Sequence, residues 1–326
     1  MSLKLRGTAV TVVVLLLISC AAPNGKHKTN QIPTHLHTDH PLVGKVWSVN
    51  HKKFVSKLEL ITHILSSDYV LLGETHDNLL HHQNQAWVIS EIAKKHSKAT
   101  VAFEMINESQ GKMLHANRIT DTDALLHSLN KVKTNWNYEQ YYRPVFDSVL
   151  TAGYDIFPAN VDRDSIVSIV IKGEQSLPDN IKSLLEKNTP TESEFSMIQQ
   201  EIVASHCDML DLETASGMVL GQRVRDAVMS LALVNNKKEN IAILVAGSQH
   251  TRKDRGVPVY IRQNDQSAKI LSLALLEVEA EVEDVKAYNE QWGVKDLPFD
   301  YIWFTPAMER PDPCEQMREY MKHHKK

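Results

Sequence analysis

The stretch Val70–Gln85, VLLGETHDNLLHHQNQ, decides the fold and opens the candidate site. The apolar run Tyr69–Leu72 predicts a buried strand that ends at Gly73. Apolar residues then recur with helical spacing over Leu79–Lys95, so a helix is predicted behind the strand. A strand that leads through polar residues into a helix is typical of an α/β sheet, where ligands bind beyond the carboxyl ends of the strands.

The polar residues after this strand form the first group of candidate site residues. Glu74 and His76 alternate, so their side chains are predicted to point to the same side. Asp77 and Asn78 need no ligand to explain them, because either can cap the following helix. Helix capping does not explain Glu74 beside His76, and we therefore interpret these two as site residues.

Further apolar runs predict the rest of the sheet. Because predicted strands and helices alternate along the chain, we expect an α/β fold with a mostly parallel sheet flanked by helices. Residues 177–235 have no strong strand pattern and predict a helical insertion or subdomain that covers one side of the sheet. The further predicted strands are Thr100–Phe103, Tyr154–Pro158, Ile241–Val245, Ile270–Leu276 and Asp300–Phe304.

Two more candidate residues follow these strands. Glu104 comes directly after the second strand, and His250 ends a Gly-x-x-His segment with the same spacing as the segment that ends at His76. Glycines permit tight turns, so the side chains that follow can turn into a shared crevice. We therefore expect one composite pocket lined by Glu74, His76, Glu104 and His250.

Length and composition limit the class of protein. The chain has 326 residues, enough for one large or two modest domains, with 42% hydrophobic and 23% charged residues. The net charge of −4 argues against nucleic acid as a partner, because phosphate binding needs a basic surface. The 16 histidines are many, and imidazole serves as a metal ligand, a proton shuttle or a hydrogen-bond partner.

The first 20 residues predict export and lipid anchoring. Lys4 and Arg6 precede an apolar run, Thr8–Ile18, that is too short for a comfortable membrane span. Leu17–Cys20 resembles a bacterial lipobox, in which the lipidated cysteine becomes the first mature residue and holds the protein on a bilayer. By resemblance to Gram-negative lipoproteins, the lack of Asp after Cys20 favours the outer membrane, facing the periplasm. An ordinary secretory signal that contains a cysteine is the alternative.

The segments next to the predicted domain have their own character. Residues 21–43 are polar and rich in histidine, which predicts a flexible tether, with a weak metal-gathering tract as the alternative. Residues 312–326 form a basic tail. Export makes a disulfide between Cys207 and Cys314 possible, although their spacing does not establish one, and Cys207 also fits a buried structural thiol.

Several motifs together resemble a known family. They are LLGETHDN with His81, His82 and Gln85; Glu104; Tyr142-Arg143-Pro144; Asn160 with Arg163; His206-Cys207; Gln222, Asp226 and Met229; Gly247–His250; and Gly256–Pro258. In these residues the chain resembles the ChaN-like haem-binding lipoproteins of the Tiki/TraB/erythromycin-esterase superfamily. The likeness predicts one ChaN-like domain over residues 44–311.

The resemblance implies a haem-binding function at the cell envelope, in haem or iron uptake, with haems stacked at a homodimer interface. It also implies that a tyrosine holds the iron, because phenolate is a hard anionic ligand that suits ferric haem. The residues that we place at the haem are His76, His81, His82, Tyr154, Arg163 and His250. Other tyrosines that remain open as iron ligands are Tyr138, Tyr141, Tyr142 and Tyr260.

The same superfamily contains hydrolases, so a hydrolase facing the periplasm is the alternative function. Glu74 and Glu104 in a partly dry pocket would have raised pKa values and act as general base and acid. Alternatively, His76 and His250 with one carboxylate would hold a divalent metal that activates water. The chain has no Gly-x-Ser-x-Gly nucleophile motif.

Overall fold

The computed structural model describes residues 34–324 except 117–118, 120 and 238–240. The expected signal peptide, the lipidation site Cys20 and most of the expected tether lie outside the described residues. Within the described part of the chain, no helix is long and apolar enough to span a bilayer.

The centre of the molecule is an eight-stranded sheet. Its strands are β2 Val46–Ser48, β3 Lys53–Val55, β4 Tyr69–Glu74, β5 Ala99–Asn107, β6 Asp155–Asn160, β7 Ile241–Gly247, β8 Ile270–Glu277 and β9 Tyr301–Thr305. The strand order is β3-β2-β9-β8-β4-β7-β5-β6. Strands β4 to β9 pair in parallel, whereas β2 is antiparallel to both β3 and β9. The predicted mostly parallel sheet is therefore confirmed.

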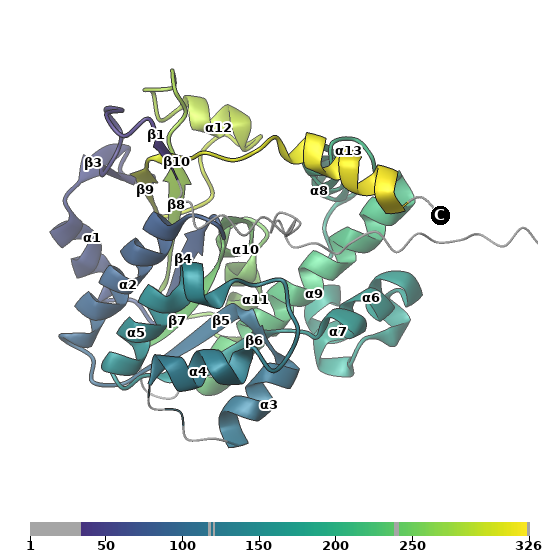
Figure 1. Ribbon diagram of the computed structural model, residues 1–326, viewed down its shortest axis with the longest axis horizontal. Helices are drawn as coiled ribbons and strands as arrows, with labels where there is room; N and C mark the ends of the chain where they lie inside the picture. The colour runs from purple at the N-terminus through teal and green to yellow at the C-terminus, as the bar shows by residue number, and fades with distance from the viewer. Residues whose placement is uncertain (1–33, 117–118, 120, 238–240, 325–326) are drawn as a thin grey trace, which may run out of the picture.

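Helices flank the sheet on both faces (Figure 1). They are α1 Lys57–Ile64, α2 Leu79–Ala93, α3 Glu108–Ala116, α4 Thr122–Leu129, α5 Arg143–Thr151, α6 Arg163–Lys172, α7 Asp179–Glu186, α8 Glu192–Ser205, α9 Leu212–Asn236, α10 Ser248–Thr251, α11 Val257–Asn264, α12 Ala287–Gln291 and α13 Pro313–His324. Val70 and Leu72 of β4 share a core with α1, α2, α4 and α5, while Tyr69 and Leu71 share one with α9 and α11. Burial on both faces explains why this strand is a continuous apolar run.

The predicted helical segment, residues 177–235, forms α7, α8 and most of α9. Leu184 of α7 packs in one apolar cluster with Val224 of α9, and Figure 1 shows α6, α7 and α9 together at one side of the sheet. Further along α9, Met229 and Leu233 join the core under the sheet. The helical segment is therefore continuous with the main core through α9.

The first helix begins later than the apolar spacing predicts. The spacing of Phe54, Leu58, Ile61 and Leu65 predicts one helix over residues 52–66. In the structure, however, Lys53–Val55 form the edge strand β3. The helix starts after Ser56, whose hydroxyl accepts a hydrogen bond from the backbone N–H of Glu59 at 3.1 Å. A serine cap placed between two short apolar runs ends the strand and starts the helix.

The end of the expected tether is ordered in the structure. His35–Leu36 form strand β1, which pairs antiparallel with β10, Ala307–Met308. His40 is buried, and its Nδ1 accepts a hydrogen bond from Leu42 N at 3.2 Å. Residues 34–43, the described part of the predicted tether, are therefore packed against the domain.

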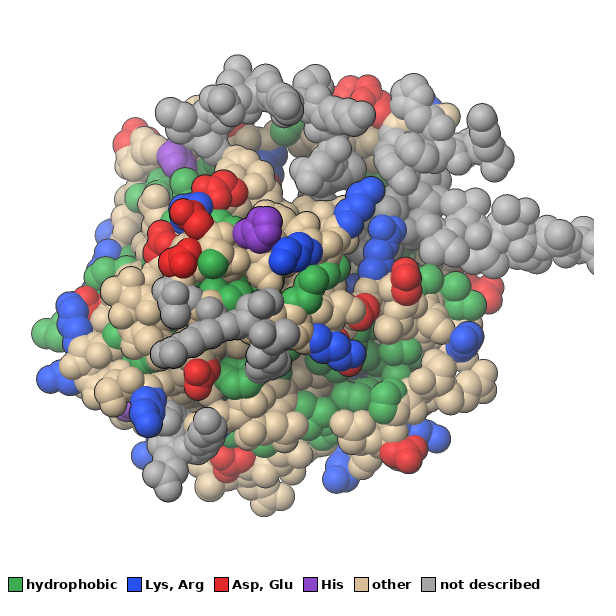
Figure 2. Space-filling view, turned by 60° about the horizontal axis from the view of Figure 1, so that its bottom comes forward, with side chains coloured by type: hydrophobic (Ala, Val, Ile, Leu, Met, Phe, Trp, Pro, Cys, Tyr) green, Lys and Arg blue, Asp and Glu red, His purple; other side chains and the backbone are tan. Residues whose placement is uncertain are grey.

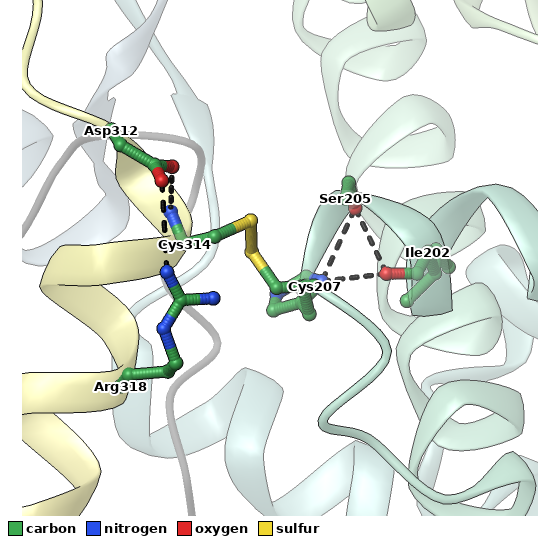
Figure 3. Close-up of a disulfide and its surroundings, with 7 residues drawn as sticks. Ile202, Ser205, Cys207, Asp312, Cys314 and Arg318 are labelled. Carbon is green, nitrogen blue, oxygen red and sulfur yellow. Dashed lines mark hydrogen bonds and ion pairs between the residues drawn. A yellow bond between two sulfur atoms is a disulfide. The ribbon is translucent and has the colours of Figure 1, made fainter.

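The C-terminal tail is helical and covalently attached. Cys314, in the first turn of α13, forms a disulfide with Cys207, which lies in the turn after α8 (Figure 3). Of the two predictions for Cys207, the disulfide is therefore the one the structure shows, and the interpretation as a buried structural thiol is wrong. The disulfide joins residues 107 positions apart, and it fixes α13 beside the helical side of the molecule.

Candidate functional site: a chain of carboxylates and imidazoles

Three neighbouring strands deliver the predicted site residues to one place. Glu74 is the last residue of β4, Glu104 lies in β5, and His250 lies in α10, directly after β7. Because β7 pairs with both β4 and β5, their carboxyl ends meet at one edge of the sheet. Together with His76, these residues form the single cluster that the sequence predicted.

Glu74 is buried, with 3% of its surface exposed, and it contacts three aromatic side chains. Its Oε1 lies 2.9 Å from His76 Nδ1 and accepts a hydrogen bond from the Tyr142 hydroxyl at 2.7 Å. Its Oε2 lies 3.2 Å from His82 Nε2, but out of line for a hydrogen bond. Burial alone would raise the pKa of Glu74, yet the His82 and His76 imidazoles hold it well below its usual range.

Glu104 lies between the two strand-end histidines. Its Oε2 accepts a hydrogen bond from the backbone N–H of Gly247 at 2.8 Å. Its Oε1 lies 3.5 Å from His250 Nε2 and 3.8 Å from His76 Nε2. Burial opposes ionisation, but the His250 and His76 imidazoles and the Gly247 N–H together lower the pKa of Glu104 to about 2.

His250 is held from its other side by Asp226 of α9. His250 Nδ1 lies 2.7 Å from Asp226 Oδ1. Burial favours neutral imidazole, but the carboxylates of Glu104 and Asp226 raise the pKa of His250 to about 10. Burial also raises the pKa of Asp226, and His250 opposes this. Because two carboxylates face His250, we assign the pair as carboxylate and imidazolium at neutral pH.

The pKa of His76 is shifted in the same direction as that of His250. Burial favours its neutral form, but Glu104 and Glu74 raise its pKa. Glu74 and Glu104 are therefore held as carboxylates, with the protonated His250 between Glu104 and Asp226. The expectation that Glu74 and Glu104 have raised pKa values is wrong, because each carboxylate faces imidazoles at close range instead of an apolar wall.

Gly247 makes this close packing possible. A Cβ atom at this position would lie 3.0 Å from His76 Nε2 and 3.5 Å from Glu104 Oε2. The first distance is shorter than nearly all real Cβ contacts, so the His76 ring would have to move by a few tenths of an ångström, whereas the second is an ordinary van der Waals contact. The glycine of the second Gly-x-x-His segment is therefore needed for space beside the imidazole of the first.

His81 has a structural position, which corrects its prediction as a haem-binding residue. It is fully buried, its Nδ1 accepts a hydrogen bond from Thr75 N at 2.9 Å, and its Nε2 lies 2.8 Å from Thr305 Oγ1. Burial, with a smaller effect of His82, lowers its pKa well below the usual range. Neutral His81 therefore fixes the loop after β4 to β9.

Tyr154 and Arg163 lie away from the cluster. Tyr154 directly precedes β6, at the amino end of that strand, and its hydroxyl donates to His96 O at 2.6 Å. It is therefore at the opposite edge of the sheet, which contradicts its predicted place at the haem. Arg163 is exposed at the start of α6, and its role at the haem stays a prediction.

The structure adds residues that the strand-end pattern missed. Tyr142 comes from a π-helical turn, Tyr138–Tyr142, and Asp226 from the interior of α9. The ring of Trp136 lies edge-on to His76, with centroids 4.8 Å apart. Tyr142 and Asp226 were among the residues that carried the family resemblance, which was the one sequence signal for them.

The outer side of the cluster is lined by half-buried side chains. His76 has 11% of its side chain exposed, and Trp136 and Tyr141 are half-buried. Among the tyrosines whose side chains the structure describes, Tyr141 alone is not buried. Its hydroxyl accepts a hydrogen bond from Gln140 Nε2 at 3.2 Å. Figure 2 shows Asp and Glu side chains beside Lys and Arg on one face, so that surface carries both signs of charge.

A metal centre is not formed by these side chains as they lie. Among the described residues, no group of three or more His, Cys, Asp or Glu side chains is arranged to hold a metal ion. The carboxylates and imidazoles instead contact one another in pairs, as between Glu74 and His76. The cluster can therefore store and transfer protons with its own groups.

Comparisons with known proteins agree with this fold. The chain matches the family described as haem-binding uptake, Tiki superfamily, ChaN, over residues 60–261, and it belongs to that family. ChaN of Campylobacter jejuni, solved with cofacial haem binding, has 23% identity and a TM-score of 0.63, over 79% of this chain and 95% of that one. A mutant of erythromycin esterase EreC in its open conformation has 11% identity and a TM-score of 0.43, over 82% and 99%. No curated protein matches the chain.

Proposed function

We propose that this protein binds haem at the bacterial cell envelope and acts in haem or iron uptake or handling. The observation that carries the proposal is the family match, which spans residues 60–261 and so includes the whole carboxylate–imidazole cluster. The cofacial haem binding described for the Campylobacter jejuni protein supports haem as the ligand. A homodimer that holds the haem is part of the proposal and comes from the family resemblance in the sequence.

Tyr141 fits the role of iron ligand better than the other described tyrosines. A phenolate is a hard anionic ligand, and bound haem would supply the ferric iron that such a ligand suits. Tyr141 is half-buried beside the site, whereas Tyr142 and Tyr138 are buried and donate to Glu74 and Met105 O. Burial and Asp77 raise the pKa of Tyr141, while Arg310 lowers it. The aromatic ring of Trp136 is close enough to the cluster to offer a flat apolar surface to a porphyrin.

The envelope location rests on the sequence and on one covalent link. The Leu17–Cys20 lipobox predicts an acylated cysteine, with the domain facing the periplasm from the outer membrane. The Cys207–Cys314 disulfide supports an oxidising compartment, because disulfides persist in the periplasm and are rare in the cytosol. Incorporation of labelled palmitate into wild type, and its loss in Cys20→Ser, tests the anchor.

Titration of the full-length protein with hemin tests the central part of the proposal. Specific binding shifts the Soret band and saturates at a fixed ratio of hemin to protein. Analytical ultracentrifugation with and without hemin tests the homodimer. A chain that gives no Soret shift at micromolar concentration does not have the proposed function.

The carboxylate–imidazole cluster favours hydrolysis as a second candidate function. A haem on the surface needs no buried Asp226–His250–Glu104 series. In this function Glu74 Oε2, a buried oxygen without a hydrogen bond, accepts a proton from attacking water. The protonated His76 or His250 then donates a proton to the leaving group. Glu74→Gln tests both functions: turnover of a model ester is lost if the site is hydrolytic, while hemin binding stays near that of wild type.

A further inference from the structure

The edge of the sheet at β3 presents an apolar surface surrounded by lysines. Phe54 of β3 is 43% exposed, and Leu58 in the first turn of α1 is 77% exposed. The fold needs no large apolar side chain at either position, because both face water. We name this surface the β3–α1 edge and define it by Lys45, Lys52, Lys53, Phe54, Lys57 and Leu58.

Lysines and aromatic rings contact one another on this edge. Lys45 Nζ lies 5.1 Å from the centre of the Phe54 ring. The Trp47 ring packs edge-on against Phe54, its partner across β2 and β3, with centroids 5.0 Å apart. Lys57 Nζ lies 4.2 Å from the centre of the Trp303 ring, which is buried in the core on the other face of the sheet. An exposed aromatic side chain, Phe54, and an exposed aliphatic one, Leu58, with lysines next to them in the chain and at the ring, are the composition that proteins use at a membrane–water boundary.

The charge of this edge differs from that of the whole chain. The chain has a net charge of −4, but residues 43–66 contain four lysines and one glutamate. Lys53 pairs with Glu59 and Lys52 with Asp296, each at 3.3 Å, and both lysine side chains remain more than half exposed. Lysine on an edge strand also discourages pairing with another sheet. That function does not explain Leu58, which lies on the helix.

The position of the edge suits a membrane that the chain already reaches. The described chain begins at residue 34 and enters β1, and Figure 1 shows β1 and β3 in the same corner of the molecule. Residues 21–33, between Cys20 and the described chain, span at most about 45 Å when fully extended. An acyl chain on Cys20 and the β3–α1 edge can therefore contact one bilayer.

We propose that the β3–α1 edge docks on the surface of an anionic bilayer and orients the domain on it. This inference rests on the envelope anchoring proposed above. The lysines attract anionic lipid headgroups, and Phe54 with Leu58 enter the boundary between headgroups and acyl chains. The anchor then holds the protein on the membrane, and the edge selects which side of the protein faces it.

Vesicle binding by the non-acylated full-length chain, Cys20→Ser, tests the edge apart from the anchor. In that background we compare Phe54→Gln/Leu58→Gln with Ile171→Gln/Leu212→Gln, a control pair whose side chains are 59% and 60% exposed elsewhere. The signal segment is common to all these chains and cancels. We expect the edge variant to bind phosphatidylglycerol vesicles at least tenfold more weakly than the Cys20→Ser parent, and the control pair to bind as the parent does.

A charge variant separates the two parts of the surface. Lys52→Gln/Lys53→Gln in the same background should lose the preference for phosphatidylglycerol over phosphatidylcholine, and the parent should lose that preference at high salt. Equal vesicle binding by parent and edge variant overturns the proposal. So does self-association of the parent through this edge in the absence of vesicles, or tighter binding to DNA than to vesicles. Palmitate labelling of wild type and hemin titration report on the proposed function separately.

Discussion

Asp226 Oδ1 lies 2.7 Å from His250 Nδ1, although the two residues come from a long helix that covers the sheet and a short helix after a strand. This contact directs His250 Nε2 toward Glu104 Oε1, 3.5 Å away. Asp226, His250 and Glu104 are thus the first members of a series of ionised groups that continues through His76 to Glu74. The stability of the protein should therefore depend on pH and on each residue of this series.

The imidazole of His250 should make stability fall at alkaline pH. Burial opposes its charge, but Glu104 and Asp226 raise its pKa from 6.5 to about 10. The folded protein therefore keeps a proton that the unfolded chain releases, and this contribution is complete below pH 6.5 and lost as pH rises toward 10. Urea unfolding at pH 6, 8 and 10 should show a steeper decline in wild type than in His250→Gln. Equal slopes would contradict the assignment.

The carboxylate of Glu104 should be needed for folding at neutral pH. Its pKa is lowered to about 2, so its contribution is present above its ordinary pKa of 4.5 and is lost as pH falls through about 2. Glu104→Gln leaves two imidazoles facing each other without their shared anion, and should destabilise the protein by about 3 kcal/mol at pH 7. The control is Glu108→Gln, at a carboxylate 65% exposed, which should change stability by less than about 0.5 kcal/mol. Urea unfolding measures both variants. If they lose the same free energy of unfolding, Glu104 does not have this role.

A glycine at position 247 should be essential for the position of the His76 ring. Gly247→Ala would place a Cβ 3.0 Å from His76 Nε2, and overpacking of this kind destabilises by about 2 kcal/mol. Combining Gly247→Ala with His76→Ala removes the clash, so the double variant should be more stable than the sum of the two single effects predicts. Thermal unfolding of the four chains measures this, and strict additivity would show that the two residues do not conflict.

The disulfide should stabilise the protein by constraining its unfolded state. A bridge across 107 residues closes a long loop, for which chain entropy gives about 5 kcal/mol. Cys207→Ser, Cys314→Ser and the double variant should lose the same amount, and dithiothreitol should lower the stability of wild type to that level. If the double variant loses more than either single variant, the cysteines have separate roles.

The sequence predicted the sheet and four site residues for clear physical reasons. Strands buried on both faces, such as β4 and β7, are unbroken apolar runs, and polar side chains at their ends mark the ligand edge. The N-cap at Asn78 also followed from local chemistry, since its side chain accepts a hydrogen bond from Leu80 N at 2.9 Å. These features depend on residues that are close together in the chain.

Features that depend on distant contacts were not predicted. Asp226 lies inside a helix, where a polar residue usually faces water, and only the folded chain brings it to His250. The pKa directions of Glu74 and Glu104 were wrong because the expectation weighed burial alone, whereas in the folded chain the imidazoles facing each carboxylate, including His82 of α2, outweigh it. The Cys207–Cys314 pairing likewise needed the packing of α13 near the end of α8.

Ferric haem spectra of tyrosine variants test the central claim most directly. Wild type titrated with hemin should show a shifted Soret band and the charge-transfer band of a phenolate ligand. Tyr141→Phe should lose the charge-transfer band, whereas Tyr154→Phe, changed at the opposite edge of the sheet, should keep it. Absence of a Soret shift in wild type would contradict haem binding, and an unchanged charge-transfer band in Tyr141→Phe would contradict the assigned ligand.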